Sequence, residues 1–199
     1  MVAVAGVGPG DLRYLTLEVY EAIKKAHRVV AFGRVGQGVR ELREDLIIVS
    51  RVKDCLDLAQ EEGDLLILAS GDPLFFGVVA FLKRSGVDIA RIYPGISSFQ
   101  YLSAQLQIPW QEAHLFSLHG RDMDLKELLD KPLSIGLTDK KTTPNVLSRA
   151  LGQLGAQGRI IAGSYLSYGD KEVIEERKIG EDFSLEEGLS VVVIELEMD

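Results

Sequence analysis

The chain has 199 residues, of which 46% are hydrophobic and 26% are charged, and its 30 acidic against 22 basic residues give a formal net charge of −8. This composition excludes a disordered tail, a collagen-like repeat and a disulfide-rich scaffold. The single cysteine, Cys55, permits no internal disulfide and disfavours a cysteine-based metal site. The acidic balance disfavours general nucleic-acid binding, which requires a basic footprint.

Neither a membrane anchor nor a secretory leader is expected. The longest unbroken apolar runs, such as 65–69 and 78–82, are far shorter than the roughly 20 residues of a membrane-spanning helix. The first residues read as a strand that begins at once, without the basic residues and longer apolar stretch of a leader. We therefore expect a cytoplasmic protein.

The first half alternates short aliphatic runs with helical patterns. The runs show little polar alternation, which indicates strands of a parallel sheet covered on both faces. Thr16 is expected to cap the first helix. The predicted strands are 2–6, 28–32, 46–49, 65–69 and 89–93, and the predicted helices are 17–26, 53–62, 75–84 and 98–105.

The second half contains more strands than helices, which predicts a mixed, partly antiparallel sheet. Thr143 followed by Pro144 is a good signal for the start of a helix, because a hydroxyl cap precedes a proline in the first turn. The predicted strands are 114–118, 133–137, 159–165, 172–178 and 190–195, and the predicted helices are 125–129 and 144–151.

The sequence thus predicts an α/β protein of two small lobes, 1–110 with a parallel sheet and 111–199 with a mixed sheet. The boundary is expected near 107–111, because Pro109 lacks the amide hydrogen that a helix interior needs. Lobes joined by a short linker commonly hold a ligand in a cleft between them, lined by loops at the carboxyl ends of parallel strands. A cofactor cleft between the lobes is therefore expected.

Three glycine-bearing loops follow predicted strands of the first lobe: GVGPGD at 6–11, SGDPLFFG at 70–77 and PGISS at 94–98. Each has an ordinary structural explanation. Asp11 would hydrogen-bond nearby amides in a sharp turn, and Asp72 with Pro73 would start the next helix. Three such loops, each after a strand expected to be parallel to the others, indicate one shared ligand site.

The first loop matches a dinucleotide-binding fingerprint poorly. The third glycine of the G-x-G-x-x-G pattern would fall on Asp11, Pro9 lacks an amide hydrogen, and no acidic residue follows the second strand. Arg34 at that point suits a 2′-phosphate, which keeps an NADP-dependent oxidoreductase as an alternative from a different class.

Three stretches, GVGPGDLRYLT (6–16), SGDPLFFG (70–77) and PGISS (94–98), resemble the signature loops of the tetrapyrrole methylase family. Its members are S-adenosylmethionine-dependent enzymes with two α/β lobes. PGISSFQYLSAQLQIPWQEAHLFSLHGRD (94–122) resembles more narrowly the CbiE-type precorrin-6Y methyltransferases, and LTDKKTTP (137–144) is similar to the family's pattern in the second lobe. The resemblance covers essentially the whole chain. It implies methylation of carbon-5 of a precorrin or cobalt-precorrin macrocycle in cobalamin biosynthesis, with S-adenosylhomocysteine as product.

The resemblance also implies which residues contact the cofactor. They are Pro9, Gly71, Asp72, Pro73, Phe75, Gly77, Ser97 and Ser98 in the first lobe, and Leu137, Ala162 and Gly163 in the second. The sulfonium already makes its methyl electrophilic, so no metal is expected, and no catalytic base is assigned.

The implied substrate carries several carboxylates, so a net negative protein must supply local cations. Arg121 is the best candidate for a bidentate carboxylate contact, and His119 beside it is a candidate base or hydrogen-bond donor. Weaker candidates are Arg13, Arg34 and Lys140.

The resemblance further implies a homodimer and a separate partner protein for the carbon-15 methylation and decarboxylation that bifunctional relatives carry in a second lobe. Within the family, a protein side chain or ribosomal RNA is an alternative substrate, although the acidic charge disfavours RNA. A non-enzymatic nucleotide-binding module is a further alternative.

Overall fold

The chain forms two compact units, Met1–Ser98 and Phe99–Asp199. The computed structural model describes residues 1–185 and 188–198, with the side chain of Arg34 outside the description. The predicted boundary near 107–111 falls inside the second unit, because α5 (Ser98–Leu106) packs with that unit: a Cβ built on Gly163 would lie 3.3 Å from a methyl carbon of Leu102. None of the described helices is long and apolar enough to cross a membrane.

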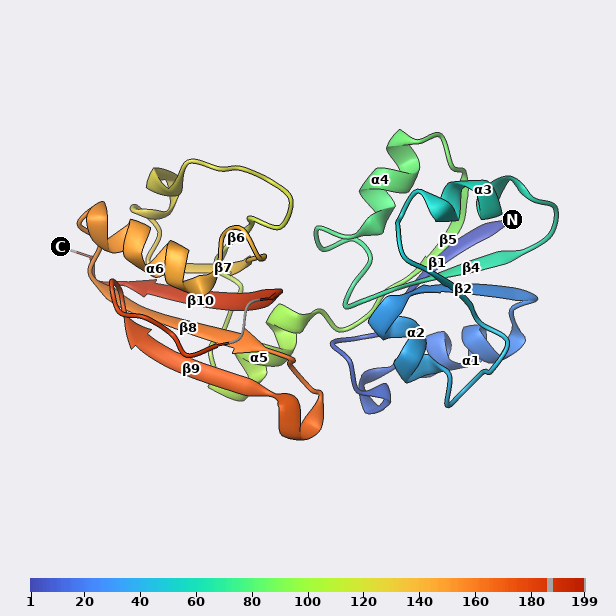
Figure 1. Cartoon of the computed structure of the whole chain (residues 1–199), viewed down its shortest axis with the longest axis horizontal. Helices are drawn as coiled ribbons and strands as arrows, with labels where there is room; N and C mark the ends of the chain where they lie inside the picture. The colour runs from blue at the N-terminus through green and yellow to red at the C-terminus, as the bar shows by residue number, and fades with distance from the viewer. Residues whose placement is uncertain (186–187, 199) are drawn as a thin grey trace. The chain divides into compact units, whose positions relative to one another are not determined.

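The first unit is built on a five-stranded sheet in the order β3-β2-β4-β1-β5, and every pairing is parallel (Figure 1). The predicted parallel sheet is confirmed, and each strand matches its prediction to within one residue. The strands are β1 (Val2–Gly6), β2 (Arg28–Phe32), β3 (Ile47–Val49), β4 (Leu65–Ala69) and β5 (Ile89–Tyr93), and the helices are η1 (Leu12–Tyr14), α1 (Leu17–Lys25), α2 (Gly33–Val39), α3 (Asp54–Gln60) and α4 (Val78–Arg84).

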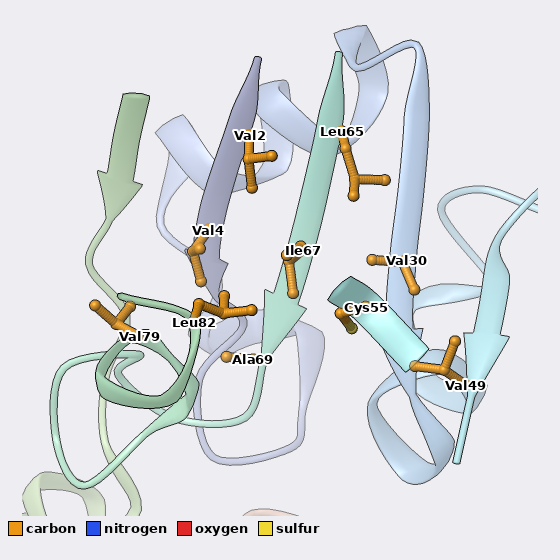
Figure 2. Packing of buried hydrophobic residues seen from close by; sticks show 10 residues of the cluster. All are labelled: Val2, Val4, Val30, Val49, Cys55, Leu65, Ile67, Ala69, Val79 and Leu82. Atoms are coloured by element: carbon orange, nitrogen blue, oxygen red, sulfur yellow. The ribbon is translucent and has the colours of Figure 1, made fainter. Parts of the chain in front are cut away.

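Helices cover both faces of this sheet, which explains why its strands are apolar without alternation. Figure 2 shows one face, where the side chains of β1, β2 and β4 point toward Cys55 of α3 and toward Val79 and Leu82 of α4. On the other face, Leu66 and Leu68 of β4 pack with residues of α1 and α2. All five residues of β4, the central strand, are buried. This rigid sheet fixes the positions at which its loops begin.

Two helices of the first unit differ from the sequence prediction. The helix α2 is not predicted, because the three glycines within GRVGQGV give it low helix propensity. Close packing of Gly36 on Ile48 of β3 and burial of Val39 stabilise it instead. The helix predicted at 75–84 begins only at Val78, because Phe76 has φ of 49° and Gly77 is extended.

The second unit is built on a mixed five-stranded sheet in the order β6-β7-β10-β8-β9, as predicted. Strands β6 and β7 are parallel, and β10 is antiparallel to both β7 and β8, so β6, β7 and β8 run in the same direction. The predicted helix at 125–129 is a single 3₁₀ turn. The elements are β6 (His114–Ser117), η2 (Leu125–Leu128), β7 (Leu133–Leu137), α6 (Pro144–Gln153), β8 (Gly158–Ser164), η3 (Gly169–Lys171), β9 (Val173–Lys178) and β10 (Ser190–Leu196).

Cys55 belongs to the core of the first unit and is fully buried. Burial, and to a lesser extent the neighbouring charge of Asp54, raises the pKa of the Cys55 thiol to about 11. The thiolate is the reactive form, so we expect no reaction with a thiol reagent at pH 8 in the folded protein. In denaturant the same reagent should titrate one thiol per chain, and equally fast labelling of the folded protein would contradict this packing.

Candidate functional site

The carboxyl ends of β4, β1 and β5 lie side by side at one edge of the first sheet. In a parallel sheet these ends share an edge, where ligands bind in many α/β proteins. The loops after these strands are the three glycine-bearing loops of the sequence, 6–11, 70–77 and 94–98. Their predicted gathering is therefore confirmed within the first unit.

The three loops pack backbone against backbone. A Cβ built on Gly6 would lie closer than 3.0 Å to the carbonyl oxygen of Gly71 and to the amide nitrogen of Gly95. A Cβ on Gly95 would be equally close to the Gly71 oxygen and to the backbone of Gly6. Gly8 and Gly71 form a short antiparallel bridge, in which each amide donates to the other's carbonyl, at 3.3 and 2.8 Å. Only glycine fits these contacts, which make the three loops one packed unit.

Asp72 links the second loop to the third. Its Oδ1 accepts the amide of Leu74 at 2.8 Å, and its Oδ2 accepts the amide of Gly95 at 3.2 Å. Hydrogen bonds to a carboxylate are roughly twice as strong as neutral ones. Asp72 does not cap a helix, because turns follow it and α4 begins only at Val78. Its carboxylate instead holds the shape of the loop cluster.

Asp11 hydrogen-bonds a nearby backbone amide in a turn, which is the structural role predicted for it from the sequence. Its carboxylate accepts the backbone amide of Arg13 at 2.8 Å and the Arg13 Nε at 2.9 Å. The side chain of Arg13, followed by its backbone amide, holds the pKa of Asp11 below its usual range. Only the single 3₁₀ turn η1, which Asp11 caps, follows the glycines directly, and the first α-helix, α1, begins at Leu17. A dinucleotide fingerprint needs an α-helix that starts directly after the glycines to meet the pyrophosphate, so the structure disfavours a dinucleotide site at this loop.

Several of the predicted cofactor residues are packed into the loops. Pro9, Gly71 and Pro73 are buried, and Ser97 is 1% exposed. Gly77 lies so close to the carbonyl group of Pro73 that a Cβ would not fit. These residues shape the loops and fix the direction of their backbone groups.

Others of the predicted residues are partly accessible. Asp72 and Ser98 are partly buried, and the Phe75 ring meets the Phe76 ring edge to face at 4.8 Å. The sequence reasoning missed two exposed apolar side chains on the same loops, Leu74 at 63% and Ile96 at 36% exposure. The sequence did contain a signal for these two residues, because an aliphatic side chain within a polar, glycine-rich loop is not expected to belong to the hydrophobic core.

In the second unit, parallel strands β6 and β7 end side by side and place two predicted regions together. The loop after β6 carries His119 and Arg121, both exposed, and the loop after β7 carries Lys140, also exposed. The amide of Leu118 donates to the carbonyl of Leu137 at 2.8 Å, which extends the pairing of the strands into these loops. Two of the weaker cation candidates lie in the first unit: Arg13 is paired with Asp11, and Arg34 lies in α2 with its side chain outside the described part.

Asp139 joins these two loops and was not singled out from the sequence. Its Oδ1 accepts the amides of Lys141 and Thr142 at 2.8 and 2.9 Å, and its Oδ2 accepts the amide of Gly120 at 3.0 Å. The Gly120 amide and then the Thr142 amide are the main causes that hold the pKa of Asp139 below its usual range. An aspartate at the start of a turn can be recognised in the sequence, but its hydrogen bond to the amide of Gly120 in the other loop cannot.

Leu137, Ala162 and Gly163 lie in strands of the second sheet. Leu137 ends β7 and is partly buried, whereas Ala162 is fully buried in the hydrophobic core. A Cβ on Gly163 would meet the side chain of Leu166. The structure thus gives Ala162 and Gly163 a packing role, and their predicted contact with a cofactor stays a prediction.

An exposed aromatic ring directly follows β8, which runs in the same direction as β6 and β7. Tyr165 is 37% exposed and meets the ring of Tyr168 edge to face at 6.4 Å. Tyr165 and Ser167 both have positive φ, 50° and 68°. Such backbone conformations are costly for these residue types and persist where the surroundings fix them.

The family profile described as Tetrapyrrole (Corrin/Porphyrin) Methylases matches residues 1–181. A probable cobalt-precorrin-7 C(5)-methyltransferase of Methanocaldococcus jannaschii is 32% identical over 139 residues, which are 65% of each chain. A cobalt-precorrin-7 C(5)-methyltransferase of Salmonella typhimurium is 30% identical over 165 residues, 81% of this chain and 82% of that protein. Among solved structures, a uroporphyrin-III C-methyl transferase of Thermus thermophilus complexed with S-adenosylhomocysteine has a TM-score of 0.77 at 21% identity and covers 96% of both chains. This last similarity concerns the fold and confirms the predicted α/β architecture of two sheets.

Proposed function

Because the chain belongs to the tetrapyrrole (corrin/porphyrin) methylase family, we propose that it methylates carbon-5 of a cobalt-bearing precorrin macrocycle with S-adenosylmethionine as methyl donor. The observation that carries the proposal is the similarity to two proteins named cobalt-precorrin-7 C(5)-methyltransferases, one of which aligns with 81% of this chain. Their names favour the cobalt-bearing form of the substrate, which the sequence left open.

The loop cluster of the first unit has the chemistry that such a donor needs. S-adenosylmethionine, when bound, supplies a methyl group made electrophilic by its sulfonium. Leu74 and Ile96 offer apolar surface for an adenine ring, and the partly buried Ser98 offers a hydroxyl for polar groups. Residues 71–77 and 94–98 therefore fit the donor; Pro9 and Ser97 are buried, and their predicted contact with the donor stays a prediction.

The contribution of this chain is mainly to position the reactants. Asp72 fixes the second loop against the third, so that the donor-binding groups have one geometry before the donor arrives. Correct positioning of two reactants lowers barriers by about 7–11 kcal/mol in favourable cases. Leu74 and Ile96 can also exclude water from the reacting centre, where charge leaves the sulfur. No side chain needs to remove a proton before the methyl transfer, because the conjugated macrocycle already carries an electron-rich carbon; the proton that the methylated carbon afterwards loses passes to water.

The second unit has the groups that a flat, multiply carboxylated macrocycle requires. His119, Arg121 and Lys140 are exposed on adjacent loops at the carboxyl ends of β6 and β7. Arginine pairs with a carboxylate through two parallel hydrogen bonds. Tyr165 presents an exposed ring on which a macrocycle can stack. These features support substrate binding by His119 and Arg121.

The proposal is tested by two measurements on the purified chain. Isothermal titration should show binding of S-adenosylhomocysteine and no binding of NADP, and the reverse pattern would reject the proposal in favour of the oxidoreductase. Incubation with labelled S-adenosylmethionine and cobalt-precorrin-7 should then add the mass of one methyl to the macrocycle. A parallel incubation with the metal-free macrocycle decides between the two substrate forms.

Three finer expectations remain predictions. They are a homodimer, a cytoplasmic location and a separate partner that performs the carbon-15 chemistry. Light scattering of the chain alone, and of the chain mixed with a carbon-15 methyltransferase, measures the first and the third.

A further inference from the structure

We propose that Asp139 is a positioning residue that holds two cation-bearing loops together as a single carboxylate-binding surface. The loops are 119–122, with His119 and Arg121, and 138–142, with Lys140 and Lys141. The inference deepens the proposed function and rests on it, since it assigns recognition of the macrocycle's carboxylates to this surface.

Charge gives the first argument. The chain is net negative at −8, yet these two short loops carry two lysines, an arginine and a histidine, all of them exposed, against two aspartates, Asp122 and Asp139. Exposed cations gathered in an acidic protein attract anionic groups locally. A ligand with several carboxylates spaced around a ring needs several cations held at fixed separations. The protein must therefore both supply the cations and fix the distances between them.

The geometry of Asp139 meets that requirement. One carboxylate oxygen, Oδ1, closes its own turn through Lys141 and Thr142, and the other, Oδ2, reaches across to the amide of Gly120. Gly120 has φ of 62°, and this left-handed conformation presents its amide to the carboxylate. The same Oδ2 lies 4.0 Å from Nδ1 of His119. Oδ1 thus stabilises the turn within its own loop, and Oδ2 links that loop to the loop of Gly120.

A second link between the loops, an ion pair, is weaker. Lys141 Nζ lies 3.2 Å from Asp122 Oδ1, but the two side chains are 81% and 94% exposed. Exposed ion pairs of this kind contribute little, because water and salt screen them. The side chain of Asp139 is only 19% exposed and accepts backbone amides, whose positions define the loops themselves. Asp139 therefore decides the separation of the cations.

The substitution Asp139→Asn separates the two tasks. An asparagine keeps one oxygen, which is best used on the two amides of Lys141 and Thr142, and its NH₂ group then faces the amide of Gly120. The turn survives while the link between the loops is lost. Asp122→Asn is the matched control, since it removes the same charge from the same surface but breaks only the exposed ion pair.

The experiment measures steady-state methylation of the cobalt-bearing macrocycle by wild type, Asp139→Asn and Asp122→Asn, with thermal unfolding of each. For Asp139→Asn we expect the KM for the macrocycle to rise about tenfold, as for a lost hydrogen bond to a charged group, while kcat and the KM for S-adenosylmethionine stay within about twofold. Asp122→Asn should resemble wild type, and both variants should keep the wild-type unfolding temperature to within about 5 °C.

Three results of these methylation and unfolding measurements would overturn the inference. One is an unchanged macrocycle KM in Asp139→Asn, and another is an equal rise in both variants, which would indicate net charge alone. The third is a parallel loss of S-adenosylmethionine affinity or of folding, which would indicate a general structural role. Titration with a carboxylated porphyrin, followed by its fluorescence, gives a readout independent of catalysis: tighter binding by wild type than by Asp139→Asn supports the inference even if methylation fails. Absence of porphyrin binding by wild type rejects it.

Discussion

Replacement of Gly6 by alanine is expected to weaken S-adenosylhomocysteine binding by about tenfold or more and to lower the free energy of unfolding by about 1–3 kcal/mol. The added Cβ would lie within 3.0 Å of backbone atoms of two other loops and of the Pro73 ring. Backbone atoms of a packed sheet edge have no low-cost way to move. The loops must therefore separate, and the donor-binding groups lose their common geometry.

Gly38→Ala is the matched control for this prediction. Gly38 lies inside α2 of the same unit, where a Cβ would make only an ordinary contact, 3.8 Å from the carbonyl oxygen of Gly10. Alanine in a helix interior is favoured over glycine by about 0.5–1 kcal/mol, so this variant should be slightly more stable and bind normally. Isothermal titration and denaturant unfolding measure both variants. Normal ligand affinity in Gly6→Ala would show that the loop contact is unimportant for binding.

Asp72→Ala is expected to give the second large effect, a loss of S-adenosylhomocysteine affinity of about tenfold with the fold retained. The substitution removes the acceptor for the amides of Leu74 and Gly95, so the second loop is released from the third. The sheet and its core do not depend on these bonds, which is why circular dichroism should be unchanged. The loss should appear mainly as faster dissociation, because the bound conformation is no longer held in place.

Asp64→Ala provides the comparison for the loss of an acidic group. Asp64 also pairs with a cation, the N-terminal amine at 3.1 Å, but both partners are largely exposed. Such a pair contributes between about 0 and 1 kcal/mol, so affinity should not change. Unchanged S-adenosylhomocysteine affinity in Asp72→Ala would refute the role assigned to this carboxylate, whatever the result for Asp64.

Local signals were sufficient for most elements of the fold. Thr16 and Thr143 cap α1 and α6 through the amides of Val19 and Val146, as predicted, because a cap needs only residues a few positions apart. The parallel sheet followed from apolar runs that do not alternate, and both faces of β4 are indeed covered. The predicted start of α4, at residue 75, was wrong. The chain turns at Phe76, which has positive φ, and Gly77 packs against the carbonyl group of Pro73, so tertiary contacts rather than helix propensity decide where the helix begins.

The family resemblance, the two-sheet α/β architecture and the three glycine loops could be predicted from the residues alone, because these features depend on short-range patterns and on the rule that parallel strands end at a common edge. The folded chain was needed to show which of the loop residues are buried in packing and which are accessible. It also revealed that Asp72 holds Gly95 and that Asp139 holds Gly120. The physical reason is that a hydrogen bond between two loops joins residues distant in sequence, and no local pattern records the partner.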